Sequence, residues 1–237
     1  MWHSVFSYYG GKSKIVESYP RPVHDLIIEP FAGAAAYAFR YRECQVWLNE
    51  LDPRTGAIWR FLLAPDATQW IEQFWPESVT VGARATDYLP GTAPMGIFEL
   101  FRAEANQGTQ GARGVHEQVT SMGVKCWPRT KRKLLEIIPQ ISHWKFTDRD
   151  YRQINYDTPA TWFVDPPYSN PAGRRYRTGG LDYAELARWC QARVGQTLVC
   201  ENAGATWLAF QPIEHRRVSI RSRYQHADAK EVLWQSA

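Results

Sequence analysis

The sequence is poor in cysteine, and its four cysteines do not stand in a metal-binding pattern. They occupy positions 44, 126, 190 and 200. This spacing contains no Cys-x-x-Cys pair and no Cys/His cluster at ligand distance. We therefore expect no metal site, and we interpret the four side chains as buried thiols in a reducing compartment.

Long hydrophobic runs are absent as well. No apolar stretch approaches the ~18 residues that a membrane span needs, and the first residues lack the basic start and apolar stretch of a signal peptide. The 16 glycines and 15 prolines follow no repeat, which excludes collagen-like and low-complexity chains. We expect a soluble, cytoplasmic protein that is a monomer and has no membrane partner.

The composition is otherwise that of a globular protein. Of 237 residues, 44% are hydrophobic and 22% are charged, enough for one large domain or for a core with an inserted lobe. The net charge of +4 is compatible with a nucleic-acid partner but is too small to indicate one. Eleven tryptophans and 12 tyrosines suit stacking on bases, although most aromatic residues belong to protein cores.

Strand and helix signals alternate at both ends of the chain. Leu26–Glu29 is an apolar strand followed by a small-residue loop and a helix to about residue 40, and residues 46–48 form the next strand. Asp52 and Pro53 begin a helix that reaches about residue 63. The later segments comprise strands at 161–164, 197–200, 214–220 and 231–235, and a helix at 183–191. This order predicts an α/β fold with a parallel sheet.

The middle of the chain, residues 64–145, lacks clear strand signals. We expect a loop at 108–114 and a short helix at 134–138 that Pro139 ends. The segment reads as a mainly helical lobe inserted between two parts of a core, 1–63 and 146–237. Its basic spot consists of Arg129, Lys131, Arg132 and Lys133. Such a run is either a solvated face or a contact to DNA phosphates.

Asp165-Pro166-Pro167-Tyr168 follows an apolar strand and is the strongest chemical signal in the sequence. An exocyclic amine such as adenine N6 is a poor nucleophile, because its lone pair is delocalised into the ring. A carboxylate and a carbonyl that hold its two N–H groups would free that lone pair, and consecutive prolines fix the direction of the carbonyl. Tyr168 could stack on a base swung out of the helix. The alternative is a plain turn that ends the strand.

Glu29-Pro30-Phe31-Ala32-Gly33 places a loop of small residues between a strand and a helix. In such a loop the backbone can approach a ligand closely, as in nucleotide-binding crevices. Glu50, at the end of the next strand, is placed to accept hydrogen bonds from ribose hydroxyls. The alternative is ordinary packing of a helix on a sheet.

Tyr8-Tyr9-Gly10-Gly11-Lys12 is a third candidate segment. Two glycines before a lysine resemble a phosphate cradle, but the full GxxxxGK[ST] spacing is missing, which disfavours a P-loop ATPase. The alternative is a glycine turn beside a solvated lysine.

Taken in order, FSYYGGKSK, IEPFAGAAA, WLNELD and FVDPPY resemble the Dam-like class of N6-adenine DNA methyltransferases. The resemblance spans most of the chain outside residues 64–145. It implies a Rossmann-like, doubly wound core with seven strands and a target-recognition lobe inserted before Asp-Pro-Pro-Tyr. It also implies S-adenosylmethionine as cofactor, double-stranded DNA as partner, and methyl transfer to adenine N6 in a flipped base.

The resemblance further implies roles for single residues. The cofactor would contact Tyr8, Gly10, Gly11, Lys12, Glu29, Pro30, Phe31, Gly33, Glu50, Asp150, Tyr151 and Asp165. The target adenine would be held and stacked by Asp165, Pro166, Pro167 and Tyr168. DNA would be bound by Arg129, Lys131, Arg132 and Lys133, and a closing hairpin would include Arg221, Lys230 and Glu231.

The sequence departs from the family in two places. Ala35 stands where many relatives have a second glycine, so that the cofactor loop is slightly bulkier. The middle segment lacks a clear Asn-Gly-Leu-x-Arg stretch, so we do not expect recognition of GATC.

Three other functions stay open beside adenine methylation. Cytosine-N4 methylation uses the same two acceptors, methylation of RNA adenine is a weaker variant, and the chain could be a catalytically silent DNA-binding relative. The intact Asp165 argues against a silent protein, since such a relative is free to lose the carboxylate.

Overall fold

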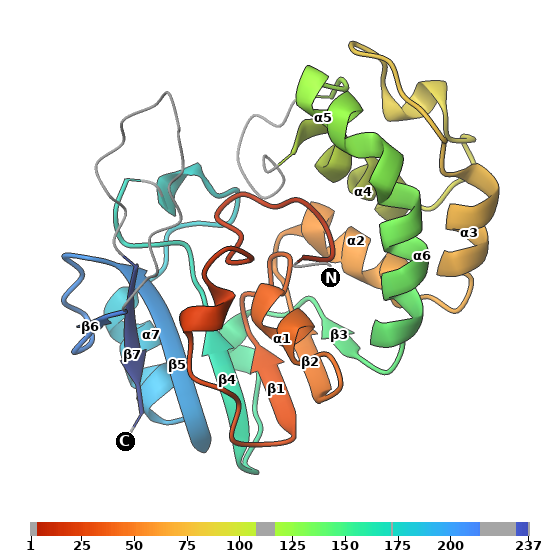
Figure 1. The fold of residues 1–237 in the computed structure, drawn as a ribbon. Helices are drawn as coiled ribbons and strands as arrows, with labels where there is room; N and C mark the ends of the chain where they lie inside the picture. Colours follow the sequence, from red (N-terminus) through yellow and green to blue (C-terminus); the bar gives the residue numbers. More distant parts are fainter. Residues whose placement is uncertain (1–3, 108–116, 172, 214–230, 237) are drawn as a thin grey trace.

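The structure is a computed structural model that describes residues 4–107, 117–171, 173–213 and 231–236. Within these ranges the fold is mixed α/β with a seven-stranded, mostly parallel sheet (Figure 1). The strands are β1 (Leu26–Glu29), β2 (Gln45–Asn49), β3 (Lys145–Thr147), β4 (Ala160–Val164), β5 (Gly195–Asn202), β6 (Gln211–Pro212) and β7 (Glu231–Gln235). Their order in the sheet is β3-β2-β1-β4-β5-β7-β6, and β7 runs antiparallel to both of its neighbours.

Each face of the sheet is covered by helices. Ile27 and Phe163 belong to one apolar cluster, with α1 (Ala36–Arg40) and α2 (Pro53–Leu62), whereas Trp162 belongs to another with α7 (Tyr183–Gln191). Because both faces are covered, β4 is buried along its whole length, as is typical of a parallel strand. No helix of the described ranges is long and apolar enough to cross a membrane.

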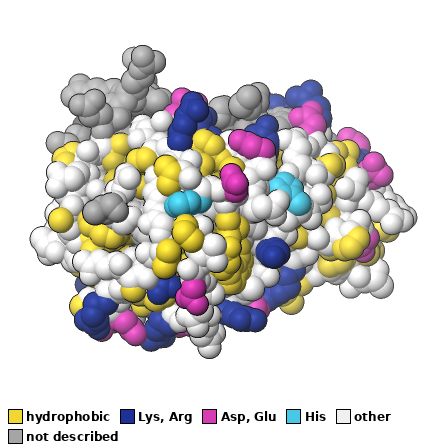
Figure 2. Space-filling model, turned by 90° about the horizontal axis from the view of Figure 1, so that it is seen from below, with side chains coloured by type: hydrophobic (Ala, Val, Ile, Leu, Met, Phe, Trp, Pro, Cys, Tyr) yellow, Lys and Arg dark blue, Asp and Glu magenta, His cyan; other side chains and the backbone are white. Residues whose placement is uncertain are grey.

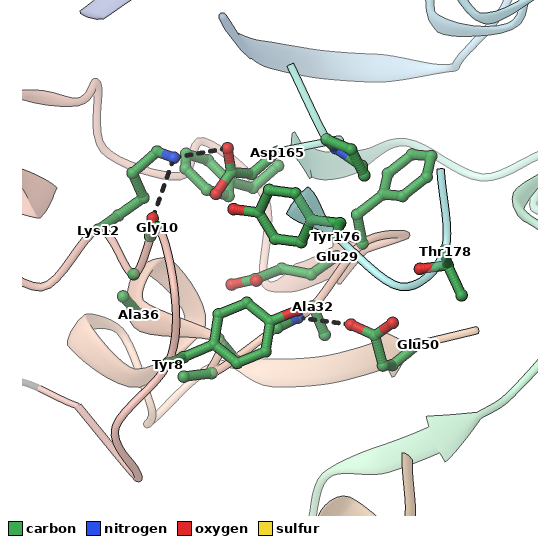
Figure 3. Close-up of a pocket in the computed structure, with 17 residues that line it drawn as sticks. Tyr8, Gly10, Lys12, Glu29, Ala32, Ala36, Glu50, Asp165, Tyr176 and Thr178 are labelled. Carbon is green, nitrogen blue, oxygen red and sulfur yellow. Dashed lines mark hydrogen bonds and ion pairs between the residues drawn. The ribbon is translucent and has the colours of Figure 1, made fainter. Parts of the chain in front are cut away.

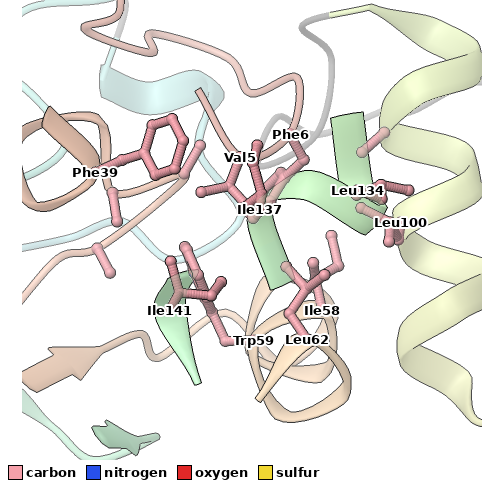
Figure 4. Packing of buried hydrophobic residues seen from close by; sticks show 14 of the residues in the cluster. Val5, Phe6, Phe39, Ile58, Trp59, Leu62, Leu100, Leu134, Ile137 and Ile141 are labelled. Atoms are coloured by element: carbon pink, nitrogen blue, oxygen red, sulfur yellow. The ribbon is translucent and has the colours of Figure 1, made fainter. Parts of the chain in front are cut away.

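The described part of residues 64–145 contains four α-helices, and its strand-like pairings are a bridge between Arg84 and Gln118 and the start of β3 at Lys145. Its α-helices are α3 (Ala67–Phe74), α4 (Met95–Asn106), α5 (Ser121–Cys126) and α6 (Thr130–Ile141). Leu100 of α4 and Leu134 of α6 belong to the same apolar cluster as Trp59 of α2 (Figure 4). The helical segment and one face of the sheet therefore share a continuous core.

The helix expected to end at Pro139 continues to Ile141, so that expectation was wrong. Proline lacks the N–H that would complete one backbone hydrogen bond, but it stands in the last turn of α6, where little helix follows. Ile138 and Ile141 are buried in the core. Burying two such side chains is worth several kcal/mol, which outweighs the lost hydrogen bond.

Other sequence expectations match the fold more closely. Strands β1 and β7 and helix α7 have the expected bounds, and Asp52 caps α2 by accepting a hydrogen bond from the Arg54 N–H. Strands β3 and β6 were not expected. The expected loop at 108–114 and strand at 214–220 lie outside the described residues.

The topology brings several strand ends to one edge of the sheet. The strand order reverses between β1 and β4, and in open α/β sheets ligands bind at such a point, outside the carboxyl ends of the strands. Because β7 is antiparallel, its first residue lies at this same edge. Figure 1 shows the N-terminal segment crossing this edge before it descends to β1.

Candidate active site

A cleft lies at the carboxyl ends of β1, β2 and β4, in two adjoining parts that share Phe31, Glu50 and Thr178. The inner part encloses about 40 Å³ of space and the outer part about 400 Å³. All twelve residues that the sequence assigns to the cofactor line one part or the other. The inner part holds Tyr8, Gly10, Gly11, Lys12, Glu29, Phe31, Gly33, Glu50 and Asp165, and the outer part holds Pro30, Phe31, Glu50, Asp150 and Tyr151. Segments that are far apart in the sequence thus converge on one cleft.

An ion pair connects the N-terminal segment to the end of β4. The ammonium of Lys12 lies 2.7 Å from the Asp165 carboxylate and donates to the Gly10 carbonyl at 3.3 Å (Figure 3). The same ammonium lies 3.8 Å from Glu231 and 4.7 Å from the centre of the Tyr168 ring. Lys12 is therefore no solvated lysine but the buried cation of an acidic site.

Burial and the surrounding charges set the ionisation of this pair. Burial raises the pKa of Asp165 and Lys12 lowers it, with a net rise to about 6. Burial also disfavours the charged form of Lys12, but Asp165 and Glu231 outweigh it and raise the lysine pKa above its ordinary value. At neutral pH the site holds an ionised Asp165 beside a protonated Lys12.

The two glutamates of the inner part are held by backbone N–H groups. Glu29 accepts a hydrogen bond from the Ala38 N–H at 2.6 Å and so satisfies a free donor in the first turn of α1. Glu50 accepts from the N–H groups of Gly33 and Asp52, each at 2.9 Å. Burial raises the pKa of both carboxyl groups, that of Glu50 to about 7.

The loop after β1 depends on backbone conformations that suit glycine. Gly33 has φ +49°, and a Cβ there would lie 2.7 Å from the Tyr8 ring. Ala35 is also left-handed, with φ +48°, although it carries a Cβ. That conformation costs an L-residue roughly 1 kcal/mol, so the departure noted at Ala35 strains the loop locally without preventing its fold.

The Asp-Pro-Pro-Tyr segment is held from several sides. Tyr183 donates its hydroxyl to the Pro167 carbonyl at 2.7 Å, and the Tyr168 hydroxyl donates to Glu231 at 2.6 Å. A Cβ on Gly173 would lie 1.8 Å from the Tyr168 carbonyl oxygen, so the chain can pass there only as glycine. Asp165 and Pro167 line the inner part of the cleft, whereas Pro166 and Tyr168 do not. None of the described residues donates a hydrogen bond to the Pro166 carbonyl.

The outer part of the cleft is aromatic and charged. The rings of Phe31 and Tyr151 lie with their centres 5.3 Å apart. Asp150 begins a 3-10 turn and pairs with Arg152 at 2.7 Å, which lowers the pKa of Asp150. An aromatic wall beside a fixed carboxylate suits a flat polar ring.

Residues 176–178 were not expected from the sequence to belong to the site, but Tyr176 and Thr178 line the inner part of the cleft. Arg177 forms an ion pair with the buried Asp52 through Nη2 at 2.6 Å and Nε at 3.2 Å. The Tyr176 hydroxyl donates to the Tyr9 carbonyl at 3.3 Å, and a Cβ on Gly10 would lie 2.1 Å from that hydroxyl. No local sequence pattern predicts these contacts, because each contact joins two residues that lie more than 120 positions apart in the chain.

The four basic residues assigned to DNA do not form one exposed surface. Arg129 and Arg132 are exposed, Arg132 lies 3.7 Å from the Glu136 carboxylate, and Lys131 pairs with Glu77. Lys133 is buried and lies 2.8 Å from Glu104, whose carboxylate also accepts the Ser7 N–H. This buried ion pair leaves Lys133 without access to a phosphate, so we remove it from the candidate DNA surface.

Acidic and thiol groups also gather beside Lys12. Ligand atoms of Asp165, Cys200 and Glu231 lie within 4.8 Å of one another. The Lys12 ammonium already provides a positive charge beside both carboxylates. We therefore assign no metal to this cluster. Arg221 and Lys230, expected in the closing hairpin, lie outside the described residues.

No protein-family model matches this chain, and no curated protein sequence matches it.

Replacing Arg177 by Ala should leave the buried Asp52 carboxylate without its cation. Breaking a buried ion pair from one side costs about 3 kcal/mol, and the segment over the inner cleft should loosen. Urea unfolding measures the loss, and Arg175→Ala, an exposed neighbour, is the matched control. Equal stability of the two variants would contradict this account of Arg177.

Glu50→Gln should change how the stability of the ligand-free protein depends on pH. The pKa of Glu50 rises on folding, so its ionisation destabilises the protein as pH increases from about 5 through 7. The variant should be less stable than wild type at pH 5, where it loses a hydrogen bond, and should gain relative to wild type by up to about 3 kcal/mol at pH 8. Thermal unfolding at both pH values tests this, and a constant difference would refute it.

Proposed function

We propose that this protein transfers a methyl group from S-adenosylmethionine to the N6 amine of adenine in DNA, after flipping the base. One observation carries the proposal: Asp165 ends β4 at the point where the strand order reverses, beside a glycine-containing, acid-lined cleft. The twelve residues to which the resemblance to Dam-like methyltransferases gives a cofactor role line this cleft.

The cleft suits S-adenosylmethionine in the chemistry of its lining. Gly33 has no side chain, so its backbone lines the cleft directly beside the Tyr8 ring. The inner part also carries the carboxyl groups of Glu29, Glu50 and Asp165. Such a site favours a cationic sulfonium. Glu50 would accept the ribose hydroxyls, and Phe31 and Tyr151 would contact the adenine ring. Bound S-adenosylmethionine supplies an electrophilic methyl group.

Asp165 and the Pro166 carbonyl are the two acceptors that an exocyclic amine needs. The Pro167 carbonyl already accepts from Tyr183, whereas the Pro166 carbonyl has no donor among the described residues. The amine would therefore donate one N–H to Asp165 and the other to Pro166. Asp165 is ionised at neutral pH, so it can stabilise the positive charge that develops on the attacking nitrogen.

The Tyr168 ring is the candidate stacking surface for the flipped base. Base–aromatic stacking contributes roughly 1–3 kcal/mol, which offsets part of the cost of unstacking. Lys12 lies over one face of this ring, so its other face would be the one to meet the base.

The exposed Arg129 and Arg132 support a DNA contact through the helical segment 64–145. Lying apart from the acidic cleft, they could bind phosphates, which position a protein without reading sequence. Figure 2 shows the molecule from below, at the end away from the carboxyl edge of the sheet. Over the area that the described residues cover, basic, acidic and hydrophobic side chains are mixed. Such a mixed surface binds a phosphate backbone less well than a clustered basic surface does.

Asp165→Ala should abolish methyl transfer, whereas cofactor binding, to which Glu29 and Glu50 also contribute, should fall far less. Its carboxylate acts on the amine as the amine attacks, so the loss falls on the transition state and should reach ~10³-fold or more. The measurement is single-turnover transfer of labelled methyl groups to adenine-containing duplexes, with calorimetry of S-adenosylmethionine binding in parallel.

Near-normal transfer in this variant would refute the mechanism. Label on cytosine would favour N4 methylation instead. A wild-type protein that binds DNA but no S-adenosylmethionine would be a silent relative.

Replacing Arg129 and Arg132 by Ala should weaken DNA binding uniformly across sequences. Each lost phosphate contact removes nearly one counterion from the salt dependence, so the slope of log K against log salt should fall by about 2. Arg188→Ala, an exposed arginine on α7, is the control. An unchanged slope in the double variant would exclude this surface.

A further inference from the structure

Glu231, the first residue of β7, lies close to three polar groups on two other segments. Its Oε1 accepts the Tyr168 hydroxyl at 2.6 Å and the Tyr19 hydroxyl at 2.8 Å, and it lies 3.8 Å from the Lys12 ammonium. The Glu231 side chain is only 11% exposed. Figure 1 shows β7 beside β5, so the antiparallel strand delivers this carboxylate from the far end of the chain.

We propose that Glu231 is a positioning residue of the candidate site: its carboxylate fixes the Tyr168 ring through the ring's own hydroxyl and gives Lys12 a second anionic partner beside Asp165. The inference rests on the proposed function, which gives Tyr168 and Asp165 their tasks.

The direction of the hydrogen bonds follows from the environment. Burial raises the pKa of the Tyr168 and Tyr19 hydroxyls well above the ordinary value, so both stay protonated and act as donors. A carboxylate is the matching acceptor, and bonds to a charged acceptor are stronger than neutral ones. A phenol held at its far end loses freedom to tilt, so the ring plane is set before a base arrives.

Glu231 also completes the charge balance around Asp165. Within the part of the chain that the structure describes, the groups facing Asp165 are Lys12 from the N-terminal segment, Glu29 from β1, Cys200 and Glu201 from β5, Glu231 from β7, and the hydroxyls of Tyr19, Tyr168 and Tyr176. Lys12 is the one cation in this set. When a substrate amine occupies Asp165, Lys12 can keep its charge paired by moving the short distance to Glu231.

The test compares Glu231→Gln, which keeps an acceptor oxygen and removes the charge, with Glu231→Ala, which removes both. Glu17→Gln, the same change at an exposed carboxylate of a surface ion pair, is the matched control. The ionisation of Asp165 is followed by NMR of protein whose aspartate carboxyl groups carry ¹³C. The Asp165 signal is identified as the one that is absent from the spectrum of the Asp165→Asn variant.

The titration midpoint of Asp165 should move to lower pH by ~1 pH unit in Glu231→Gln, because a neighbouring negative charge that raises its pKa is gone. It should not move in Glu17→Gln. The Tyr168 hydroxyl proton, identified by its absence in Tyr168→Phe, should be visible in slow exchange in wild type and lost in Glu231→Ala. A midpoint that stays in place, or a hydroxyl proton that survives in Glu231→Ala, would overturn the inference.

These measurements need no methyl transfer, so they decide about Glu231 even if wild type proves inactive and the proposed function fails. If wild type is active, Tyr168→Phe and Glu231→Ala should each slow transfer roughly tenfold. The double variant should be no slower than the worse single one, because both remove the same hydrogen bond. If the double variant instead lost activity by the product of the two single losses, this would contradict the inference that Glu231 acts through Tyr168.

Discussion

The ion pair between Lys12 and Asp165 is the contact on which the rest of the cleft depends. A carboxylate at the end of a buried parallel strand is costly unless a cation compensates it. Here the cation comes from a segment near the N-terminus, which crosses the carboxyl edge of the sheet to reach it. Once Lys12 is in place, Tyr8 and Gly10 also lie against the cleft, and the small-residue loop after β1 has its second wall.

The remaining acids of the site show a second way of keeping charge in a protein interior. Among the described residues, no cation lies within ion-pair distance of Glu29 or Glu50, and backbone N–H groups from a helix start and a loop hold the two carboxyl groups instead. Backbone donors compensate a carboxylate only in part, which is why the pKa values of both groups stay raised. In the ligand-free protein the ionised forms of both glutamates are thus disfavoured, and a positively charged or hydrogen-bond-donating ligand would stabilise them.

Local sequence patterns predicted much of this site because its residues stand at strand ends. A short apolar run followed by an acid marks such an end, and parallel strands bring their carboxyl ends together without further information, as for Glu29, Glu50 and Asp165. The contacts of Arg177 and Glu231 could not be predicted this way, since they depend on which distant segments meet. Lys133 was misjudged for the same reason: a basic run describes composition, whereas burial against Glu104 is decided by tertiary packing.

The buried contact among Ser7, Glu104 and Lys133 ties α4 and α6 to the segment that lines the inner cleft. With the shared apolar core, it makes the helical segment part of the same folding unit as the carboxyl edge of the sheet. The segment is therefore not a detachable module. Its removal as a whole would expose the core and leave the buried charge of Glu104 without Lys133. The outer surface of the segment can vary one side chain or loop at a time, whereas its inner face is fixed by these contacts.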